Sequence, residues 1–196
     1  MRYFIKINKK NLITQSILIL IGFITGYLIY YYLFMELVVL FVSRGFAYYF
    51  VSILCLIGSI VGSILLLNLI FYRKINKPLF YIITITYFCI LFSVLFLRRY
   101  TEQIYIFNPL ISLKDIFTSR LMLFQSFMNF IVFIPIGYFV RKLSYKKVLL
   151  FSILFSVLIE FCQVLTRRGF FDTLDIILYV LAITLGYFIS KEPLNK

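Results

Sequence analysis

The side chain most able to do chemistry in this chain is a carboxyl group inside an apolar segment. Glu160 lies in the largely apolar run Val148 to Leu165. A carboxylate at membrane depth costs about 3 kcal/mol and is rarely retained unless it is paired or used. More polar side chains follow it closely: Gln163, Arg167, Arg168, Asp172 and Asp175. We expect these residues to form the functional site, for ligand binding or for catalysis.

Two kinds of chemistry are open to this set of residues. Glu160, Gln163 and Arg167 are three and four residues apart, so they share one face of a helix. In a binding site, arginines hold phosphate or carboxylate groups, while acidic residues orient an amine or a cation. The expected ligand-binding set also includes a polar residue of an earlier helix: Asn129, Glu160, Gln163, Arg167, Arg168, Asp172 and Asp175.

Catalysis is the alternative, and it would have to depend on carboxylates. The chain contains no His, which excludes Ser-His hydrolases and other His-dependent enzymes. Glu160 would act as a general base, with Asp172 and Asp175 as further candidates, although no residue can be assigned a catalytic role. Asp172 and Asp175 also suit the start of a helix, as a cap and a first-turn acid. We expect no metal ion and no cofactor.

Composition identifies the class of protein that must position these residues. Hydrophobic residues make up 63% of the 196 residues and charged residues only 14%, and the mean hydropathy is +1.04. Soluble domains are about half apolar and a quarter charged. The net charge of +13 comes from short basic clusters between apolar runs, which indicates membrane topology rather than nucleic-acid binding.

Six apolar runs are long enough to cross a bilayer, for which about 17 to 25 residues are needed. They predict an all-α, polytopic bundle of six transmembrane helices. The runs are Leu12 to Phe34, Ala47 to Tyr72, Leu79 to Leu97, Leu121 to Val140, Val148 to Leu165 and Leu174 to Ser190. Between the third and fourth runs, Arg98 to Arg120 forms either a short interfacial helix or an ordinary connector.

The distribution of basic residues predicts the orientation of these spans in the membrane. If both termini are cytoplasmic, the inner segments carry 13 of the 20 Lys and Arg, as the positive-inside rule requires. Those inner residues are Arg2, Lys6, Lys9, Lys10, Arg73, Lys74, Lys77, Arg141, Lys142, Lys146, Lys147, Lys191 and Lys196. We therefore expect a multi-pass protein of a bacterial cell membrane whose polar site opens outward.

Small residues predict where helices pack closely. Gly22 with Gly26, and Gly58 with Gly62, have the four-residue spacing that favours close contact, here between the first two spans. In the fourth span, Pro135 removes the hydrogen bond to the carbonyl of Ile131 and permits a kink near Asn129.

An ordered set of motifs resembles the VanZ-like family of bacterial membrane proteins, whose founding member is associated with teicoplanin resistance. The motifs are Asn129 to Gly137 (NFIVFIPIG), Glu160-x-x-Gln163 and Asp172-x-x-Asp175. The resemblance covers approximately Tyr87 to Tyr187. It divides the chain into residues 1–86, which hold two spans and the start of the third, and a VanZ-like membrane domain at 87–190.

The chain departs from the family pattern just after the last motif. The family usually has an Asn four residues after the second Asp and then a Gly-rich stretch. Tyr179 and Ala182 stand at those places, and only Gly186 matches.

The resemblance implies a role in glycopeptide resistance or in binding a cell-envelope lipid. Expected partners are the lipid bilayer and either a cell-wall precursor lipid or a lipophilic glycopeptide, with no nucleic acid. The alternative is a His-independent membrane enzyme that acts on a lipid or lipid-linked substrate through Glu160 and Asp175. A transporter is disfavoured because no inverted repeat is visible and only one carboxyl group lies deep in a span.

The predicted orientation can be checked with two cysteine substitutions, at Ser144 and Thr173. Since the loop containing Thr173 is expected outside, an impermeant thiol reagent added to intact cells should label Thr173→Cys and not Ser144→Cys. The opposite labelling pattern would invert the orientation.

Overall fold

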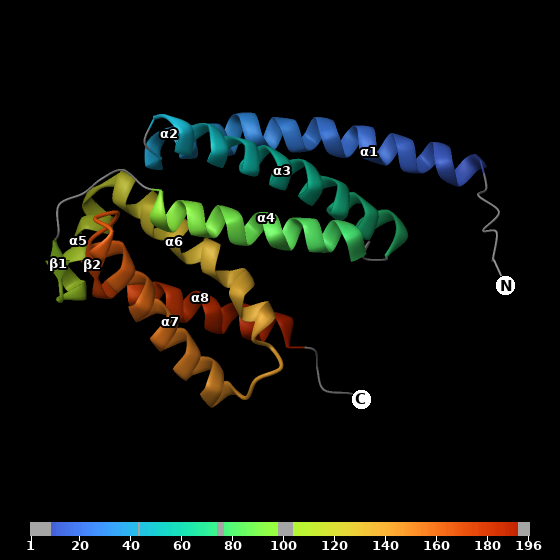
Figure 1. Ribbon diagram of the computed structural model, residues 1–196. Coiled ribbons are helices and arrows are strands. Elements are labelled where there is room, and N and C mark those ends of the chain that lie inside the picture. Colours follow the sequence, from blue (N-terminus) through green and yellow to red (C-terminus); the bar gives the residue numbers. More distant parts are fainter. Residues whose placement is uncertain (1–8, 43, 74–76, 98–103, 192–196) are drawn as a thin grey trace. The chain divides into compact units, whose positions relative to one another are not determined.

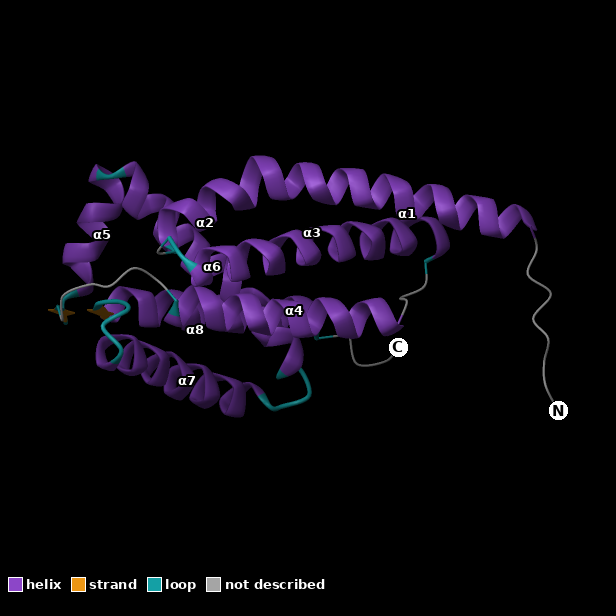
Figure 2. Cartoon of the chain, turned by 45° about the horizontal axis from the view of Figure 1, so that its top comes forward, coloured by secondary structure: helices purple, strands orange, loops and turns teal. Residues whose placement is uncertain are grey.

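The computed structural model of the protein describes residues 9–42, 44–73, 77–97 and 104–191 (Figure 1). Figure 2 shows that most of this chain is helical, so the all-α prediction is confirmed. The elements in chain order are α1 (Lys9–Ile29), the π-helical turn η1 (Tyr30–Phe34), α2 (Met35–Phe41), α3 (Phe46–Tyr72), α4 (Lys77–Phe96), β1 (Tyr105–Ile106), α5 (Pro109–Thr118), α6 (Arg120–Phe139), α7 (Tyr145–Leu165), β2 (Phe171–Asp172) and α8 (Thr173–Ser190).

Six helical stretches of the described chain are long and apolar enough to cross a membrane, which confirms the number of predicted spans. The first of them differs from its prediction. Its apolar helical stretch is Ile13–Val39, whereas the sequence pattern ends at Phe34, because α1, η1 and α2 follow one another without a break. At about 1.5 Å per residue, these 27 residues exceed the hydrocarbon thickness of a typical bilayer.

The chain divides into two compact units, Met1–Arg99 and Tyr100–Lys196, and each is described by itself. In the first unit, α3 packs against both α1 and α4. Gly22 and Gly26 lie directly against the backbone of α3, so the close packing predicted for the first two spans is confirmed at these positions. Gly58 and Gly62 instead face side chains of α4, where a methyl group would meet ordinary contacts or slightly tight ones.

In the second unit, α8 is the central helix, against which α5, α6 and α7 pack. Its inward side chains are buried among these neighbours, and several are completely inaccessible to solvent: Tyr179, Ala182, Ile183 and Tyr187. The ring of Tyr179 stacks on Phe133 of α6, with centroids 3.9 Å apart. At the other end of the unit, the Tyr187 hydroxyl donates a hydrogen bond to the carbonyl of Leu143 at 3.3 Å.

Two glycines set the approach of α6 and α8. A Cβ atom on Gly137 would collide with the backbone of Ile183, Gly186 and Tyr187, and one on Gly186 would collide with the carbonyl of Ile134. The two helices therefore touch backbone to backbone, immediately after the Pro135 position of α6. The same pair of helices also meets at Asn129 and Asp175, so they run in the same direction, and α7 runs opposite to them.

A short parallel pairing joins the segments that precede α5 and α8. Tyr105 pairs with Phe171 and Ile106 with Asp172, and the Thr173 hydroxyl donates to the carbonyl of Ile106 at 3.2 Å. The sequence allowed either a short interfacial helix or an ordinary connector at Arg98 to Arg120, and this segment contains the helix α5. Residues 98–103 lie outside the described chain. The location of α5 at a membrane interface stays a prediction.

The contacts of the glycines predict that replacement by alanine lowers the stability of the protein at Gly137 and Gly186 but not at Gly62. Gly137→Ala and Gly186→Ala should each destabilise the protein by at least about 2 kcal/mol, because backbone atoms cannot move aside for the added methyl group. Gly62→Ala is the matched control, since its Cβ would lie 3.6 Å from the side chain of Ile83 and Ala favours a helix by about 1 kcal/mol over Gly. Thermal unfolding in detergent measures both effects, and an unchanged midpoint for Gly186→Ala would contradict the close crossing.

Candidate functional site

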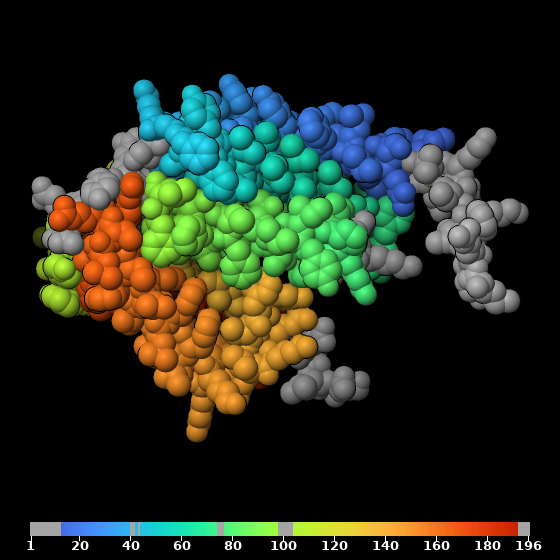
Figure 3. All heavy atoms as spheres, viewed as in Figure 1, coloured from blue at the N-terminus to red at the C-terminus, as the bar shows by residue number. Residues whose placement is uncertain are grey.

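A buried polar stripe runs along one face of α7. Ser152, Ser156, Glu160 and Gln163 follow one another at helical spacing, and none is more than 1% exposed. The opposite face of α7 carries exposed apolar side chains: Leu154, Leu158, Phe161 and Leu165. The visible surface of α7, orange in Figure 3, forms part of the outside of the second unit. The helix thus turns its polar stripe toward α8 and its apolar face outward.

Glu160 is the centre of the site, and only one of its two carboxyl oxygens has a hydrogen-bond partner. Oε2 accepts a hydrogen bond from the backbone N–H of Asp172 at 3.1 Å. Oε1 is buried and accepts none, although the hydroxyl group of Tyr179 lies close to the carboxyl group. Asp175 and Asp172 lie close enough to Glu160 for their negative charges to act on its carboxyl group.

The two aspartates at the start of α8 have different roles. Asp172 is the N-cap of the helix, and its Oδ1 accepts a hydrogen bond from the backbone N–H of Leu174 at 2.8 Å, so the capping interpretation is confirmed for this residue. Asp175 lies in the first turn, where its Oδ2 accepts a hydrogen bond from the side-chain amide of Asn129 at 2.9 Å. Asp175 is therefore both a first-turn acid and a member of the site.

Two details differ from the expected arrangement. The sequence groups Asn129 with Glu160 and Gln163 in one ligand-binding set; all three are buried, but the side-chain amide of Asn129 donates a hydrogen bond to Asp175 on α8. The sequence also groups Arg167 and Arg168 with Glu160, whereas the hydrogen bond that Glu160 accepts at 3.1 Å comes from the backbone N–H of Asp172. The chain turns back after α7, and this brings the start of α8 to Glu160.

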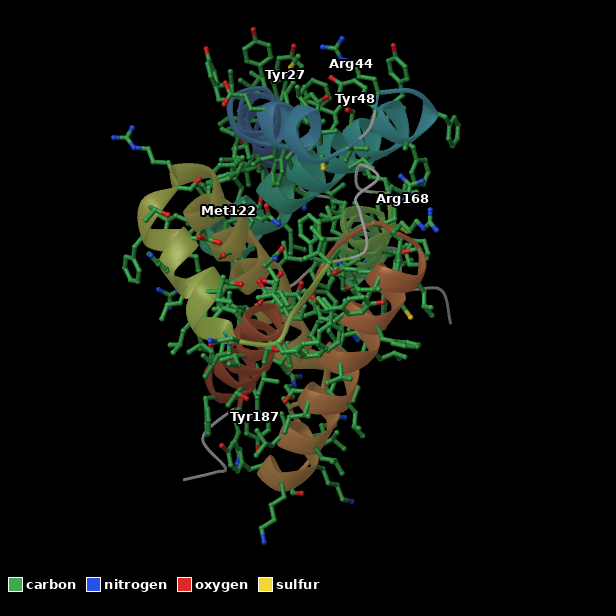
Figure 4. All side chains as sticks on the ribbon, turned by 90° about the vertical axis from the view of Figure 1, so that its left-hand side faces the viewer. Tyr27, Arg44, Tyr48, Met122, Arg168 and Tyr187 are labelled. Carbon is green, nitrogen blue, oxygen red and sulfur yellow. The ribbon has the colours of Figure 1, made fainter. Side chains whose placement is uncertain are left out.

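The end of α7 explains the placement of the two arginines. The N–H of Arg168 donates to the carbonyl of Gln163 at 2.9 Å, and that of Arg167 to Val164 at 3.1 Å, which is the hydrogen-bond pattern of a Schellman motif. Arg167 has a φ of 53° at the position that usually holds glycine. It is exposed, while Arg168 is half-buried and lies in the loop that follows α7 (Figure 4).

Sequence reasoning missed two residues of the site, Ser156 and Tyr179. Ser156 is completely buried and its hydroxyl has no hydrogen-bond partner; its position four residues before Glu160 was a signal. Tyr179 was noted only as a departure from the family pattern, and the structure brings its hydroxyl to Glu160. Among the described residues, no three His, Cys, Asp or Glu side chains are grouped so as to hold a metal ion.

The comparison with known families agrees with these features. Residues 78–193 match the family model described as VanZ/LLP1. This chain belongs to the VanZ/LLP1 family. The matched region begins in α4 and contains every residue of the candidate site. Together with the six apolar helices, it makes the chain a multi-pass membrane protein of the VanZ/LLP1 family. No curated protein and no solved structure matches the chain.

The backbone of Arg167 yields a test that separates its structural and functional roles. Arg167→Gly should raise the free energy of unfolding of this VanZ/LLP1 protein by about 1 kcal/mol, because glycine adopts the left-handed conformation without steric conflict. Arg167→Ala removes the same charge without relieving the conflict and should change stability little. Thermal unfolding measures the difference, and equal midpoints for the two variants would argue against the positive φ.

Proposed function

We propose that this VanZ/LLP1-family protein binds an amphiphilic molecule of the bacterial cell envelope and thereby contributes to teicoplanin-type glycopeptide resistance. The ligand is a cell-wall precursor lipid or the lipophilic glycopeptide itself. The observation that carries this proposal is Glu160, a completely buried side chain with one carboxyl oxygen that has no hydrogen-bond partner. Buried carboxyl groups contribute little net stability even when paired, so this one indicates use.

The surroundings of the site support an amphiphilic ligand. The outward face of α7 is apolar, and an acyl chain can lie along it within the bilayer. The polar end of such a molecule then reaches the end of α7, where the acidic residues and the arginines gather. A soluble ligand would gain nothing from the apolar face.

Charges of both signs support recognition of a head group. Asp172 and Asp175 are only partly buried at the start of α8, and Arg167 is exposed two residues after the end of α7. A guanidinium group binds phosphate or carboxylate through two parallel hydrogen bonds. Holding Arg167 in a left-handed conformation is unfavourable by about 1 kcal/mol, which supports a use for its side chain in binding an anionic group.

The proposed orientation places this end of the second unit outside the cell, with both termini cytoplasmic. Two observations support it. The basic residues are concentrated in the segments assigned to the inside. The alternating directions of α6, α7 and α8 agree with three successive crossings of the membrane.

A membrane-embedded enzyme is the second candidate, and the same oxygen favours it. Oε1 of Glu160 has a lone pair available to accept a proton in a site without histidine. Turnover of a lipid or lipid-linked substrate by the purified protein, abolished by Glu160→Gln while the substrate still binds, would favour this candidate over a binding protein.

The binding proposal predicts that Glu160→Gln and Asp175→Asn leave a folded protein but weaken resistance. The amides keep the shape and one acceptor oxygen of each side chain while removing the charge. Teicoplanin susceptibility of a sensitive host measures this at matched membrane levels of each variant. Asp115→Asn is the matched control, since Asp115 is an exposed carboxylate on α5 outside the site, and it should protect the host as well as the unmodified protein.

Two results would contradict the proposal. The first is an unmodified protein that alters susceptibility to no lipoglycopeptide or other envelope-directed drug. The second is native mass spectrometry of the protein, released from its own membrane, that finds no retained lipid or precursor. If only the first occurs, the ligand is an envelope lipid and resistance is not its role.

A further inference from the structure

The second unit carries a group of basic side chains at the end opposite to Glu160. They lie in the loop between α6 and α7, in the first turn of α7 and at the C-cap of α8. We call this group the basic cluster: Arg141, Lys142, Lys146, Lys147 and Lys191. Along α7, Lys146 precedes Glu160 by about 20 Å at 1.5 Å per residue. The basic cluster is therefore separate from the candidate site.

Tyr187 holds the parts of the basic cluster together. Its backbone lies against Gly137 near the end of α6, its hydroxyl donates a hydrogen bond to the carbonyl of Leu143 at 3.3 Å, and its ring centroid lies 6.5 Å from that of Tyr145. Tyr187 is completely buried, and Figure 4 shows it at the end of the second unit away from Arg168. The basic side chains thus belong to one surface rather than to three independent segments.

Aromatic rings position two of the cations. The guanidinium carbon of Arg141 lies 4.0 Å from the centroid of the Tyr138 ring, and the ammonium nitrogen of Lys191 lies 5.1 Å from that of Tyr187. Both distances are within the range of a cation–π contact. A guanidinium group over a ring still presents N–H donors at its edge, and these suit the oxygens of a phosphate group.

The described residues near the basic cluster supply no acidic side chain to balance it. The sequence has no Asp or Glu from residue 121 to residue 159, and Glu192 lies outside the described residues. The first turn of α7 holds Lys146 and Lys147 without an acid, although positive charge is unfavourable at the start of a helix. These lysines therefore do not stabilise α7, and the positive charge of the surface suits an anion from outside the protein.

Apolar side chains next to the basic cluster indicate that this anion belongs to a lipid. Phe139 lies two residues before Arg141, and Phe188 and Ile189 lie just before Lys191; all three are exposed. In a membrane protein such side chains are covered by acyl chains. A free anion would bind the cations and leave these side chains uncovered, whereas a phospholipid meets both surfaces.

We propose that the basic cluster binds the head group of an anionic phospholipid such as phosphatidylglycerol, with Arg141 at the phosphate. This inference goes beyond the proposed function, because it concerns the other end of the unit and does not depend on the ligand of Glu160. The predicted orientation puts the lipid in the cytoplasmic leaflet, whose anionic lipids attract basic segments. Lysines that only set the orientation would not discriminate between lipids after insertion.

The test compares two lipids that differ in net charge. Purified full-length protein in detergent is mixed with dihexanoyl phosphatidylglycerol or dihexanoyl phosphatidylcholine, and native mass spectrometry measures the bound fraction at each concentration. We expect a lower Kd for phosphatidylglycerol. The difference should shrink in about 1 M ammonium acetate, where the Debye length is about 3 Å.

Variants connect this preference to the basic cluster. Combining Lys146→Gln with Lys147→Gln should raise the Kd for phosphatidylglycerol at least about tenfold, and Arg141→Gln should raise it about fivefold. The matched control combines Lys114→Gln with Arg120→Gln, which removes two exposed charges from α5 and the start of α6, and it should keep the original Kd. If the double lysine variant does not fold, the comparison of Arg141→Gln with the control decides.

Four results would overturn the inference. Equal Kd values for the two lipids would show that the surface does not recognise an anionic head group. An unchanged Kd in both variants of the basic cluster would leave its residues with a role in orientation alone. An equal loss in the control would show that only net charge matters. Displacement of phosphatidylglycerol by an equal concentration of inorganic phosphate would assign the surface to a free anion.

Discussion

The hydrogen bond from the backbone of Asp172 to Glu160 is the interaction on which the rest of the site depends. It joins the C-terminal part of α7 to Asp172, the N-cap of α8, across 12 residues of chain. The same Asp172 caps α8 through its side chain and pairs with Ile106 through β2. One carboxyl group therefore fixes where α8 begins, and this fixes the direction of the acidic side chains in its first turn.

A second constraint comes from the opposite end of α8. The backbone contact at Gly137 and Gly186 determines how closely α6 and α8 approach. Because the two contacts are only about two to three turns apart on each helix, the glycine contact also affects whether Asn129 reaches Asp175. The polar contact is made near the start of α8 and the apolar contact near its end, so packing in one part of the helix pair preserves hydrogen bonding in the other.

Much of this could be predicted from the sequence, and the remainder has identifiable physical reasons. Hydropathy gives the spans because a bilayer requires about 20 apolar residues, and Glu160 is conspicuous in such a run. The partners of Glu160 were not predictable, because helical spacing describes one helix and says nothing of how the next one returns. A backbone N–H donor cannot be recognised from residue types, because every residue except proline has one. Tyr179 was hidden for a related reason, since an aromatic residue in an apolar helix resembles ordinary core. The left-handed conformation of Arg167 was not predictable either, because the residue after a helix end that adopts it is usually glycine.

The contact between Glu160 and Asp172 also bears on how the protein is made. Synthesis proceeds from the N-terminus, so α7 leaves the ribosome before the backbone donor that satisfies its carboxyl group. While the chain is still growing, Glu160 has to enter the membrane protonated, remain in the insertion machinery or wait at the water interface. α8 consequently completes the insertion of α7. A chain that stops after α7 leaves the carboxyl group of Glu160 without the backbone donor that Asp172 supplies.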